Sequence, residues 1–221
     1  MEEFRRIRRE FLILLSIFLL PAVYTSSGAV DPELFNTVHA HFGLLIQNVP
    51  RILLLLYLME LEGYGWKDRY GLRLHGSPAR LVIPATGVTG VLLAVAVTAN
   101  LLASIIGAPG APPFEFNSPT PLIYALSGFS LLSVGYMEEL FFRSYVITRL
   151  QQLGSSNRNA LLYSAALFSL GHLYQGVQGV LFALLAGVAL GAIYLRWNRL
   201  HPLALGHAVY NYLGLLFSGL F

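Results

Sequence analysis

The sequence predicts an all-α membrane protein: a polytopic bundle of about seven transmembrane helices, or eight, that encloses a polar cavity within the bilayer. Composition is the first observation behind this prediction. Of the 221 residues, 56% are hydrophobic and only 11% are charged, whereas a soluble domain carries about 25% charged residues. The other two observations are a series of long apolar segments and the placement of basic residues between them. We expect one integral membrane domain over residues 1–221.

The apolar segments supply the expected helices. A helix needs about 20 mostly apolar residues to cross a bilayer. Candidates cover residues 11–28, 41–60, 81–107, 121–149, 159–175, 178–196 and 201–220. The fourth is long enough to tilt or to project from the membrane. A tight turn, QGVQG, joins the fifth to the sixth.

Basic residues alternate from one connecting segment to the next. They gather at the N-terminus and after the second, fourth and sixth apolar segments. They are Arg5, Arg6, Arg8, Arg9, Lys67, Arg69, Arg73, Arg80, Arg149, Arg158, Arg196 and Arg199. The intervening stretches VDPELFNTV and GAPGAPPFEFNSPT contain no Lys or Arg. Because basic loops remain in the cytoplasm, the pattern predicts a multi-pass protein of the cell membrane with a cytoplasmic N-terminus.

Two of these segments have a second interpretation. The first has a basic start, a short apolar core and the sequence TSSGAV, which also fit a cleaved signal peptide, although the charge alternation works with this segment retained. In the second, Arg51 follows Pro50. We expect Arg51 either to reach the interface from a kinked helix or to contribute to a site.

Composition also excludes several functions. The chain has no cysteine, so disulfides, thiolate catalysis, iron–sulfur clusters and cysteine zinc sites are excluded. The net charge is +3, but the basic residues stand at the ends of apolar segments and form no patch. We therefore expect membrane lipid, and no nucleic acid, as a partner.

Ionisable residues interrupt the fourth apolar segment. The stretch VGYMEELFFRSYV places Glu138, Glu139 and Arg143 after residues 122–137, which carry no charge. Such groups are costly in a membrane helix unless they are paired or line a cavity, so a functional site is the default hypothesis. Glu139 and Arg143 are four residues apart and are predicted to pair. Glu138 is rotated by about 100° and stays available, unless all three form a buried salt-bridge network.

Two later segments contribute further polar groups. In FSLGHL, Phe168 and His172 share a helix face, and in HPLALGHAVYNYL so do His207 and Asn211. Each pair alone is also compatible with simple hydrogen bonding between helices. His201, next to Pro202, is expected to cap or solvate the start of its helix. At 1.5 Å per residue, the other groups can converge on one cavity nearer the cytoplasmic side.

A carboxylate, two imidazoles and an amide suit peptide-bond hydrolysis. Glu138 is the candidate general base that activates water, with His172 orienting that water. His207 and Asn211 are candidate donors to the oxyanion. Alternatively, Glu138, His172 and His207 are a ligand set for catalytic Zn²⁺, in which case Glu139 is the candidate base. No H-E-x-x-H motif occurs, so such a site is not a standard zincin.

Three motifs in order on successive segments carry a family resemblance. Glu138-Glu139-x-x-x-Arg143, Phe168-x-x-x-His172 and His207-x-x-x-Asn211 together resemble the CPBP family. These are the CAAX-protease and bacteriocin-processing membrane peptidases, also called the Abi family, which includes the CAAX prenyl endopeptidases. The resemblance covers about residues 121–215, the expected catalytic core. The N-terminal half is similar only in being expected to span the membrane.

The resemblance implies roles for individual residues. Glu138 matches the catalytic glutamate and His172 its water-positioning partner, while His207 and Asn211 match the oxyanion-hole groups. Glu139 and Arg143 match supporting positions. Both glutamate-dependent and zinc-dependent mechanisms are described for such enzymes, so Zn²⁺ stays open as a cofactor. The implied substrate is a membrane-associated peptide or a prenylated protein that loses its C-terminal tripeptide.

Two other functions are alternatives to an intramembrane endopeptidase. One is a non-catalytic membrane scaffold or bacteriocin self-immunity protein of the same fold, which has little use for the intact set of polar groups in lipid. The other is a transporter or proton relay, which predicts repeated halves and broken helices, and neither is evident in the sequence.

Overall fold

The computed structural model describes residues 2–25, 33–74, 76–108, 116–117 and 119–217. Every regular element within these ranges is a helix, which confirms the predicted all-α class. Some predicted features lie outside the described residues. They are the sequence TSSGAV after its first residue, the ends of the first and last predicted segments, and most of the proline-rich loop before Pro121.

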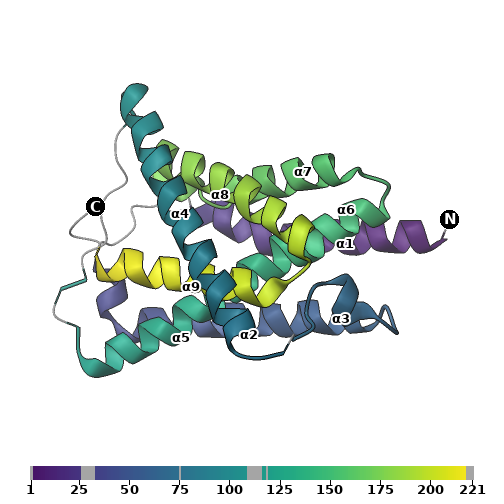
Figure 1. Ribbon diagram of the computed structural model, residues 1–221, viewed down its shortest axis with the longest axis horizontal. Coiled ribbons are helices and arrows are strands. Elements are labelled where there is room, and N and C mark those ends of the chain that lie inside the picture. The colour runs from purple at the N-terminus through teal and green to yellow at the C-terminus, as the bar shows by residue number, and fades with distance from the viewer. Residues whose placement is uncertain (1, 26–32, 75, 109–115, 118, 218–221) are drawn as a thin grey trace. The chain divides into compact units, whose positions relative to one another are not determined.

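Each predicted apolar segment is helical (Figure 1). The nine α-helices of the described residues are α1 Glu2–Thr25, α2 Val38–Glu60, α3 Trp66–Arg69, α4 Ala79–Ile105, α5 Pro121–Glu138, α6 Ile147–Gln152, α7 Asn157–Leu170, α8 Gly176–Trp197 and α9 Leu200–Leu216. A π-helical segment, η2 (Glu139–Val146), joins α5 to α6. Two short 3-10 helices, η1 Leu34–Asn36 and η3 Leu173–Gln175, precede α2 and α8.

Within the described residues, three helices are long and apolar enough to cross a membrane, judged by length and composition: Val38–Glu60, Ala79–Ile105 and Leu173–Trp197. They correspond to the second, third and sixth predicted segments. The fifth and seventh are shorter than expected, because α7 has 14 residues and α9 has 17. The fourth is divided among α5, η2 and α6.

The chain divides into two compact units, each made of separate stretches. Unit 1 contains residues Met1–Ala29, Ala94–Ala111 and Phe142–Trp197; unit 2 contains Val30–Leu93, Pro112–Phe141 and Asn198–Phe221. The predicted catalytic core, 121–215, therefore contributes to both units.

Unit 1 is built on the pair α7 and α8. Gly187 lets the two helices approach closely, since a Cβ added there would lie 2.8 Å from the Cα of Ala165. Helix α1 packs against α7 and η3. It buries Ile7, Phe11, Leu14 and Phe18, whose spacing of three and four residues makes one apolar face.

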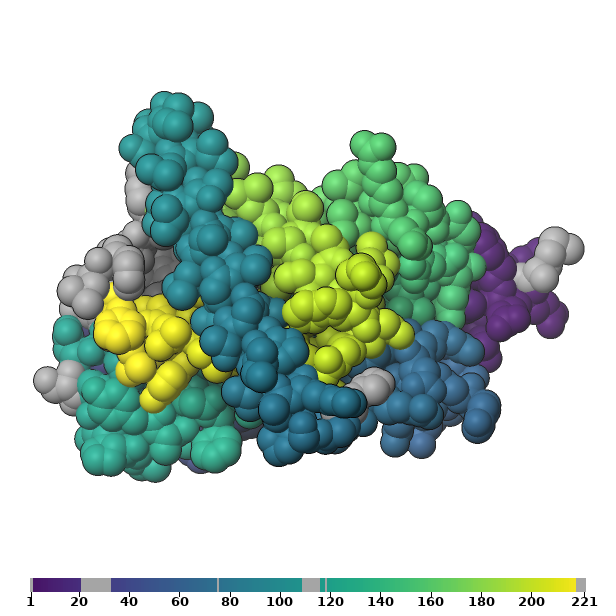
Figure 2. All heavy atoms as spheres, viewed as in Figure 1, coloured from purple at the N-terminus to yellow at the C-terminus, as the bar shows by residue number. Residues whose placement is uncertain are grey.

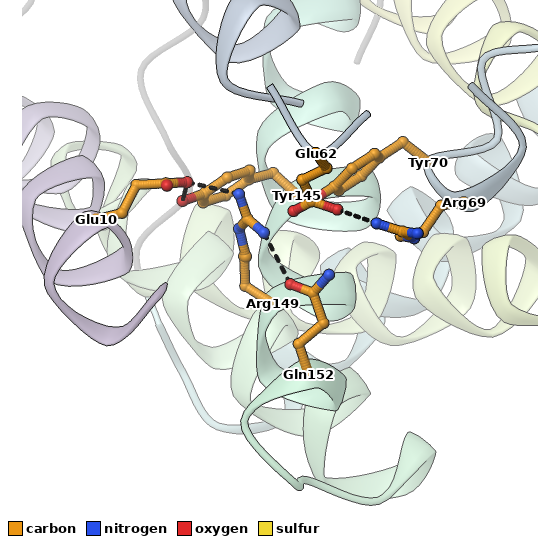
Figure 3. Close-up of polar contacts among 7 residues, drawn as sticks. All are labelled: Glu10, Glu62, Arg69, Tyr70, Tyr145, Arg149 and Gln152. Carbon is orange, nitrogen blue, oxygen red and sulfur yellow. Dashed lines mark hydrogen bonds and ion pairs between the residues drawn. The ribbon is translucent and has the colours of Figure 1, made fainter. Parts of the chain in front are cut away.

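A buried ion pair attaches α1 to α6 within the same unit. Arg149 donates to Glu10 Oε1 at 2.6 Å, and the hydroxyl of Tyr145 donates to the same oxygen at 2.7 Å (Figure 3). Arg149 also donates to Gln152 at 2.8 Å. The side chain of Arg149 is only 2% exposed, so this residue of the predicted basic pattern is neutralised inside the protein.

In unit 2, α5 packs against both α2 and α9. Polar side chains join α2 to α5: the His41 ring lies 2.9 Å from Ser130 Oγ and 3.1 Å from Ser127 Oγ. Asn48 donates to Ser133 at 3.3 Å. Interhelical hydrogen bonds of this kind stabilise helix pairs in lipid. Helix α2 continues past Pro50, and Arg51 lies within it, half-buried.

Candidate active site

The two glutamates stand at the junction between α5 and η2. Thr120 caps the start of α5 by accepting from the backbone N–H of Ile123 at 3.3 Å, and Pro121 occupies the first turn, both of which favour helix initiation. Glu138 is the last residue of α5, and Glu139 is the first of η2. π-Helical turns are rare and are frequently found at functional sites.

His207 of α9 contacts both glutamates within unit 2. Its Nδ1 lies 2.8 Å from Glu139 Oε1, and its Nε2 lies 3.6 Å from Glu138 Oε2. The shorter contact is a hydrogen bond in which Nδ1–H donates to the carboxylate. The longer one exceeds hydrogen-bond length, and a water molecule can bridge a separation of this size. The imidazole is therefore held by Glu139 and presents its second nitrogen toward Glu138.

The two glutamates differ in accessibility. The side chain of Glu139 is fully buried, whereas that of Glu138 is 17% exposed. Water can therefore reach Glu138 more readily than Glu139. The prediction has Glu139 held by Arg143 and Glu138 available; the structure shows Glu139 accepting a hydrogen bond from His207, and its pair with Arg143 stays a prediction.

A close approach of α5 and α9 makes these contacts reachable (Figure 1). At Gly135, an added Cβ would lie 2.8 Å from the carbonyl oxygen of Ala204 and 2.9 Å from the backbone nitrogen of Ala208. Such distances are below van der Waals contact, so only glycine fits at this spacing. Side chains on helices lean toward the N-terminal end, which brings Glu139 and His207 together across this contact.

The remaining predicted residue of α9 is Asn211. It lies four residues after His207, one turn further along the same helix, and is half-buried. Residues four apart share a helix face. Asn211 is therefore on the side of α9 from which His207 meets the glutamates.

A second link between α5 and α9 was not predicted. The Tyr136 hydroxyl lies 3.2 Å from His201 Nδ1, and His201 Nε2 lies 3.0 Å from the carbonyl oxygen of Leu72. In the compatible tautomer, Nε2–H donates to Leu72 and Nδ1 accepts from Tyr136. His201 stands in the first turn of α9 as expected, but it bridges two segments instead of capping its own helix.

The motif of Phe168, His172 and Arg143 belongs to unit 1. His172 lies just after the end of α7, in the turn that precedes η3, and not inside a helix as expected. Its Nδ1 donates to the carbonyl oxygen of Phe168 at 2.9 Å, and the two rings are 4.5 Å apart. Arg143 is buried with its guanidinium 4.2 Å from the Phe168 ring centroid. The predicted Glu139–Arg143 pair and the convergence of His172 with Glu138 stay predictions.

The zinc hypothesis concerns Glu138, His172 and His207. Among the described residues, no group of three or more His, Asp or Glu side chains is arranged to hold a metal ion. Two of the three hypothetical ligands are nevertheless close: Glu138 Oε2 and His207 Nε2 are 3.6 Å apart. Two ligands of one tetrahedral zinc ion are about 3.3 Å apart. If zinc were bound through Nε2 of His207, Glu139, which accepts from Nδ1, would orient the imidazole ring.

The family comparison concerns the same residues. Residues 120–213 match the family model described as type II CAAX prenyl endopeptidase Rce1-like. The family resemblance is confirmed over this segment. The Rce1-like segment contains every predicted site residue and supports a CAAX-type membrane protease at the family level; it does not favour the scaffold or immunity alternative. No curated protein and no solved structure matches the chain.

Sequence reasoning identified Glu138, Glu139, His172, His207 and Asn211 in the Rce1-like segment but missed Tyr136 and its contact with His201. The available signal was that Tyr136 precedes Glu139 by three residues and so shares its helix face. It also missed Gly135, whose role depends on the distance between two helices and has no local pattern.

Proposed function

We propose that the chain is an intramembrane endopeptidase in which Glu138 activates water for hydrolysis of a peptide bond. The observation that carries this proposal is the contact of one buried imidazole, His207, with two adjacent glutamates of different accessibility. A structural salt-bridge network has no need for an accessible carboxylate 3.6 Å from an imidazole nitrogen. A hydrolase needs such an accessible carboxylate, because the base must reach both water and substrate.

In the proposed reaction, Glu138 takes a proton from water, and the hydroxide attacks the carbonyl carbon of the scissile bond. The carbonyl oxygen becomes an oxyanion, the C–N bond then breaks, and the departing amine receives the proton from Glu138. His207, with Nε2 protonated, and Asn211 donate to the oxyanion. Glu139 compensates the charge of the imidazolium, because it accepts from Nδ1.

His172 is proposed to position the attacking water. Its Nδ1–H donates to the Phe168 carbonyl, so in the neutral ring Nε2 has the lone pair and accepts a proton or a hydrogen bond. The Phe168 ring contacts both the imidazole of His172 and the guanidinium of Arg143. Arg143 and Glu139 are proposed as supporting residues that hold the site.

The proposed substrate is the C-terminus of a prenylated CAAX protein, from which the last three residues are removed. The Rce1-like match supports this substrate class. We further propose that the protein is a multi-pass protein of the cell membrane with its N-terminus in the cytoplasm, so that the substrate enters from the cytoplasmic side. The basic segments between the helices support this orientation.

A cleavage assay on purified protein in detergent tests the proposal. The substrate is a fluorogenic farnesylated CAAX peptide, and wild type is compared with Glu138→Ala and with Glu60→Ala, which removes an exposed carboxylate at the end of α2. We expect Glu138→Ala to lose cleavage and Glu60→Ala to retain it. Equal activity of Glu138→Ala and wild type contradicts the assignment of the base.

The same assay distinguishes the two catalytic types. Each protein is measured with and without a strong zinc chelator. Cleavage that is indifferent to the chelator supports the glutamate-activated water. Loss on chelation, with recovery on adding zinc, supports the zinc-dependent alternative, for which Glu138, His172 and His207 are the proposed ligands. A wild type that cleaves other membrane peptides but not the farnesylated one contradicts only the CAAX substrate.

A further inference from the structure

The segment 61–80 runs from the end of α2 into the first turn of α4, and both helices are long and apolar enough to cross a membrane. A connection between consecutive spans lies at one surface of the bilayer. Its composition is typical of that location, since aromatic and basic residues are enriched at the headgroup level. Leu61 is 61% exposed, Leu74 is 74% exposed, and Tyr64 is fully exposed. Figure 2 shows the region around α3 at the protein surface.

The acidic residues of this segment are already paired within it. Glu62 accepts from the Tyr70 hydroxyl at 2.6 Å and forms an ion pair with Arg69 (Figure 3). Asp68 forms an ion pair with Arg73 at 2.9 Å. These two pairs neutralise two of the basic residues, and the other basic residues of the segment determine its net charge.

Hydrogen bonds to the start of α9 bring together the main chain beside three basic residues. Asn198 donates to the carbonyl oxygen of Asp68, next to Lys67, at 2.7 Å. Arg199 donates to the carbonyl oxygen of Arg80 at 2.5 Å. Among the described residues, no salt bridge involves Lys67, Arg80 or Arg199. These three form a cationic cluster that no carboxylate of the described chain compensates.

We propose that this cluster, Lys67, Arg80 and Arg199, binds the headgroup of an anionic lipid, with Tyr64, Leu61 and Leu74 inserted at the membrane boundary. Charge complementarity selects this partner, because anionic lipid attracts Lys and Arg near the bilayer surface by about 1 kcal/mol each, or about fivefold in local lipid preference per cation. The exposed apolar side chains require a lipid surface, which a dissolved anion does not provide.

Lipid binding at this cluster also acts on α9. The segment is hydrogen-bonded to four consecutive residues, Asn198 to His201, and Leu200 N–H donates to the Gly71 carbonyl at 2.8 Å. Helix α9 then carries His207 six residues further on. A bound headgroup stabilises this attachment and with it the position of α9. This consequence for catalysis rests on the proposed function, whereas the lipid binding does not.

Tryptophan quenching tests the lipid site without requiring activity. The chain has two tryptophans, so Trp197→Phe leaves Trp66, which lies next to Lys67. The full-length protein is placed in phosphatidylcholine nanodiscs that contain either brominated phosphatidylglycerol or the same fraction of brominated phosphatidylcholine. Quenching is normalised to unbrominated discs. We expect brominated phosphatidylglycerol to quench Trp66 several-fold more strongly.

Matched variants locate the effect. The triple variant Lys67→Gln/Arg80→Gln/Arg199→Gln is expected to abolish the preference for phosphatidylglycerol. The double variant Arg80→Gln/Arg199→Gln keeps the contact of Lys67 with Trp66, and it is expected to reduce the preference. Arg5→Gln/Arg8→Gln/Arg9→Gln removes the same charge from exposed positions of α1 and is expected to retain it. Equal quenching by the two lipids in the parent protein, or an unchanged preference in the triple variant, overturns the proposal. So does full competition by inorganic phosphate, which shows a site for dissolved anions.

The Glu138→Ala background separates this proposal from the proposed function. The lipid preference is expected to be the same there as in the parent protein. If Glu138→Ala cleaves as well as the wild type while the quenching preference persists, the catalytic proposal fails and the lipid site stands.

Discussion

His207 connects the two glutamates of the candidate site and gives them different roles. Its hydrogen bond to the fully buried Glu139 fixes the ring, and its other nitrogen faces the partly exposed Glu138. The arrangement resembles that of a catalytic imidazole held by a buried carboxylate, in which the carboxylate orients the ring and stabilises its charged form.

Replacement of Glu139 by glutamine is therefore expected to lower kcat with little change in KM. The amide keeps the volume and can keep one hydrogen bond, but it removes the charge that stabilises the protonated ring. Loss of one oxyanion donor costs about 100-fold or more in kcat, and we expect an effect of this size. Steady-state kinetics with the farnesylated peptide measure it. An unchanged kcat would show that Glu139 has no part in holding a charged His207.

At this scale, the sequence predicts which residues form the site better than it predicts their contacts. Glu138, Glu139 and His207 are conspicuous because ionisable residues are rare in apolar helices. The pairing of Glu139 with His207 depends on two helices that are distant in sequence and on the π-helical geometry of η2, in which hydrogen bonds join residues five apart. The i, i+4 spacing used to pair Glu139 with Arg143 assumes an α-helix.

Two glycines of α5 provide a matched pair of substitutions at the scale of the element. Gly135→Ala places a Cβ against the α9 backbone, whereas Gly128 has no neighbouring atom within 4 Å. We expect Gly135→Ala to lower the free energy of unfolding by about 1–3 kcal/mol. Gly128→Ala is expected to be neutral or to stabilise the helix by up to about 1 kcal/mol.

Thermal unfolding in detergent and peptide cleavage measure the two glycine variants. Because Gly135 sets the distance over which His207 reaches Glu139, its variant is expected to lose activity as well as stability. If both variants behave alike, the close approach of α5 and α9 does not control the site.

Glu10 of α1 makes a polar contact that attaches this helix to α6. Glu10→Gln removes the charge that compensates Arg149, which is 2% exposed. Leaving a buried charge without its partner costs about 3 kcal/mol, so we expect a marked decrease in the unfolding temperature. Glu3→Gln, at an exposed position of the same helix, is the control. Equal unfolding temperatures for the two variants would show that the apolar face of α1 is sufficient to hold it.

At the scale of the whole molecule, the absence of cysteine permits a direct test of orientation. Single cysteines are introduced at Ser77, before α4, and at Glu33, before α2; both positions are exposed. We expect a membrane-impermeant maleimide to label Glu33→Cys in intact cells and Ser77→Cys only after the membrane is opened. The reverse pattern would place the N-terminus outside the cytoplasm.

The all-α class and the approximate positions of the long apolar helices could be predicted from the sequence, because a run of apolar residues is a local signal. The residues at which the helices begin and end agreed less closely with the prediction. The helix that was expected to run through His172 ends at Leu170, and the continuous segment 121–149 contains a π-helical stretch. These features depend on hydrogen bonds and packing between distant residues. The burial of Arg149 does too, whereas the alternation of basic residues assigned it to a connecting segment at the membrane surface.

The attachment of segment 61–80 to α9 has a consequence for how this protein can diversify. All four acceptors on the segment are main-chain carbonyl oxygens, those of Asp68, Gly71, Leu72 and Arg80. Substitutions that change the outward side chains between them leave these acceptors in place. The outward side chains of the segment can therefore change, and its surface chemistry with them, while the hydrogen bonds that attach it to the helix of His207 are kept.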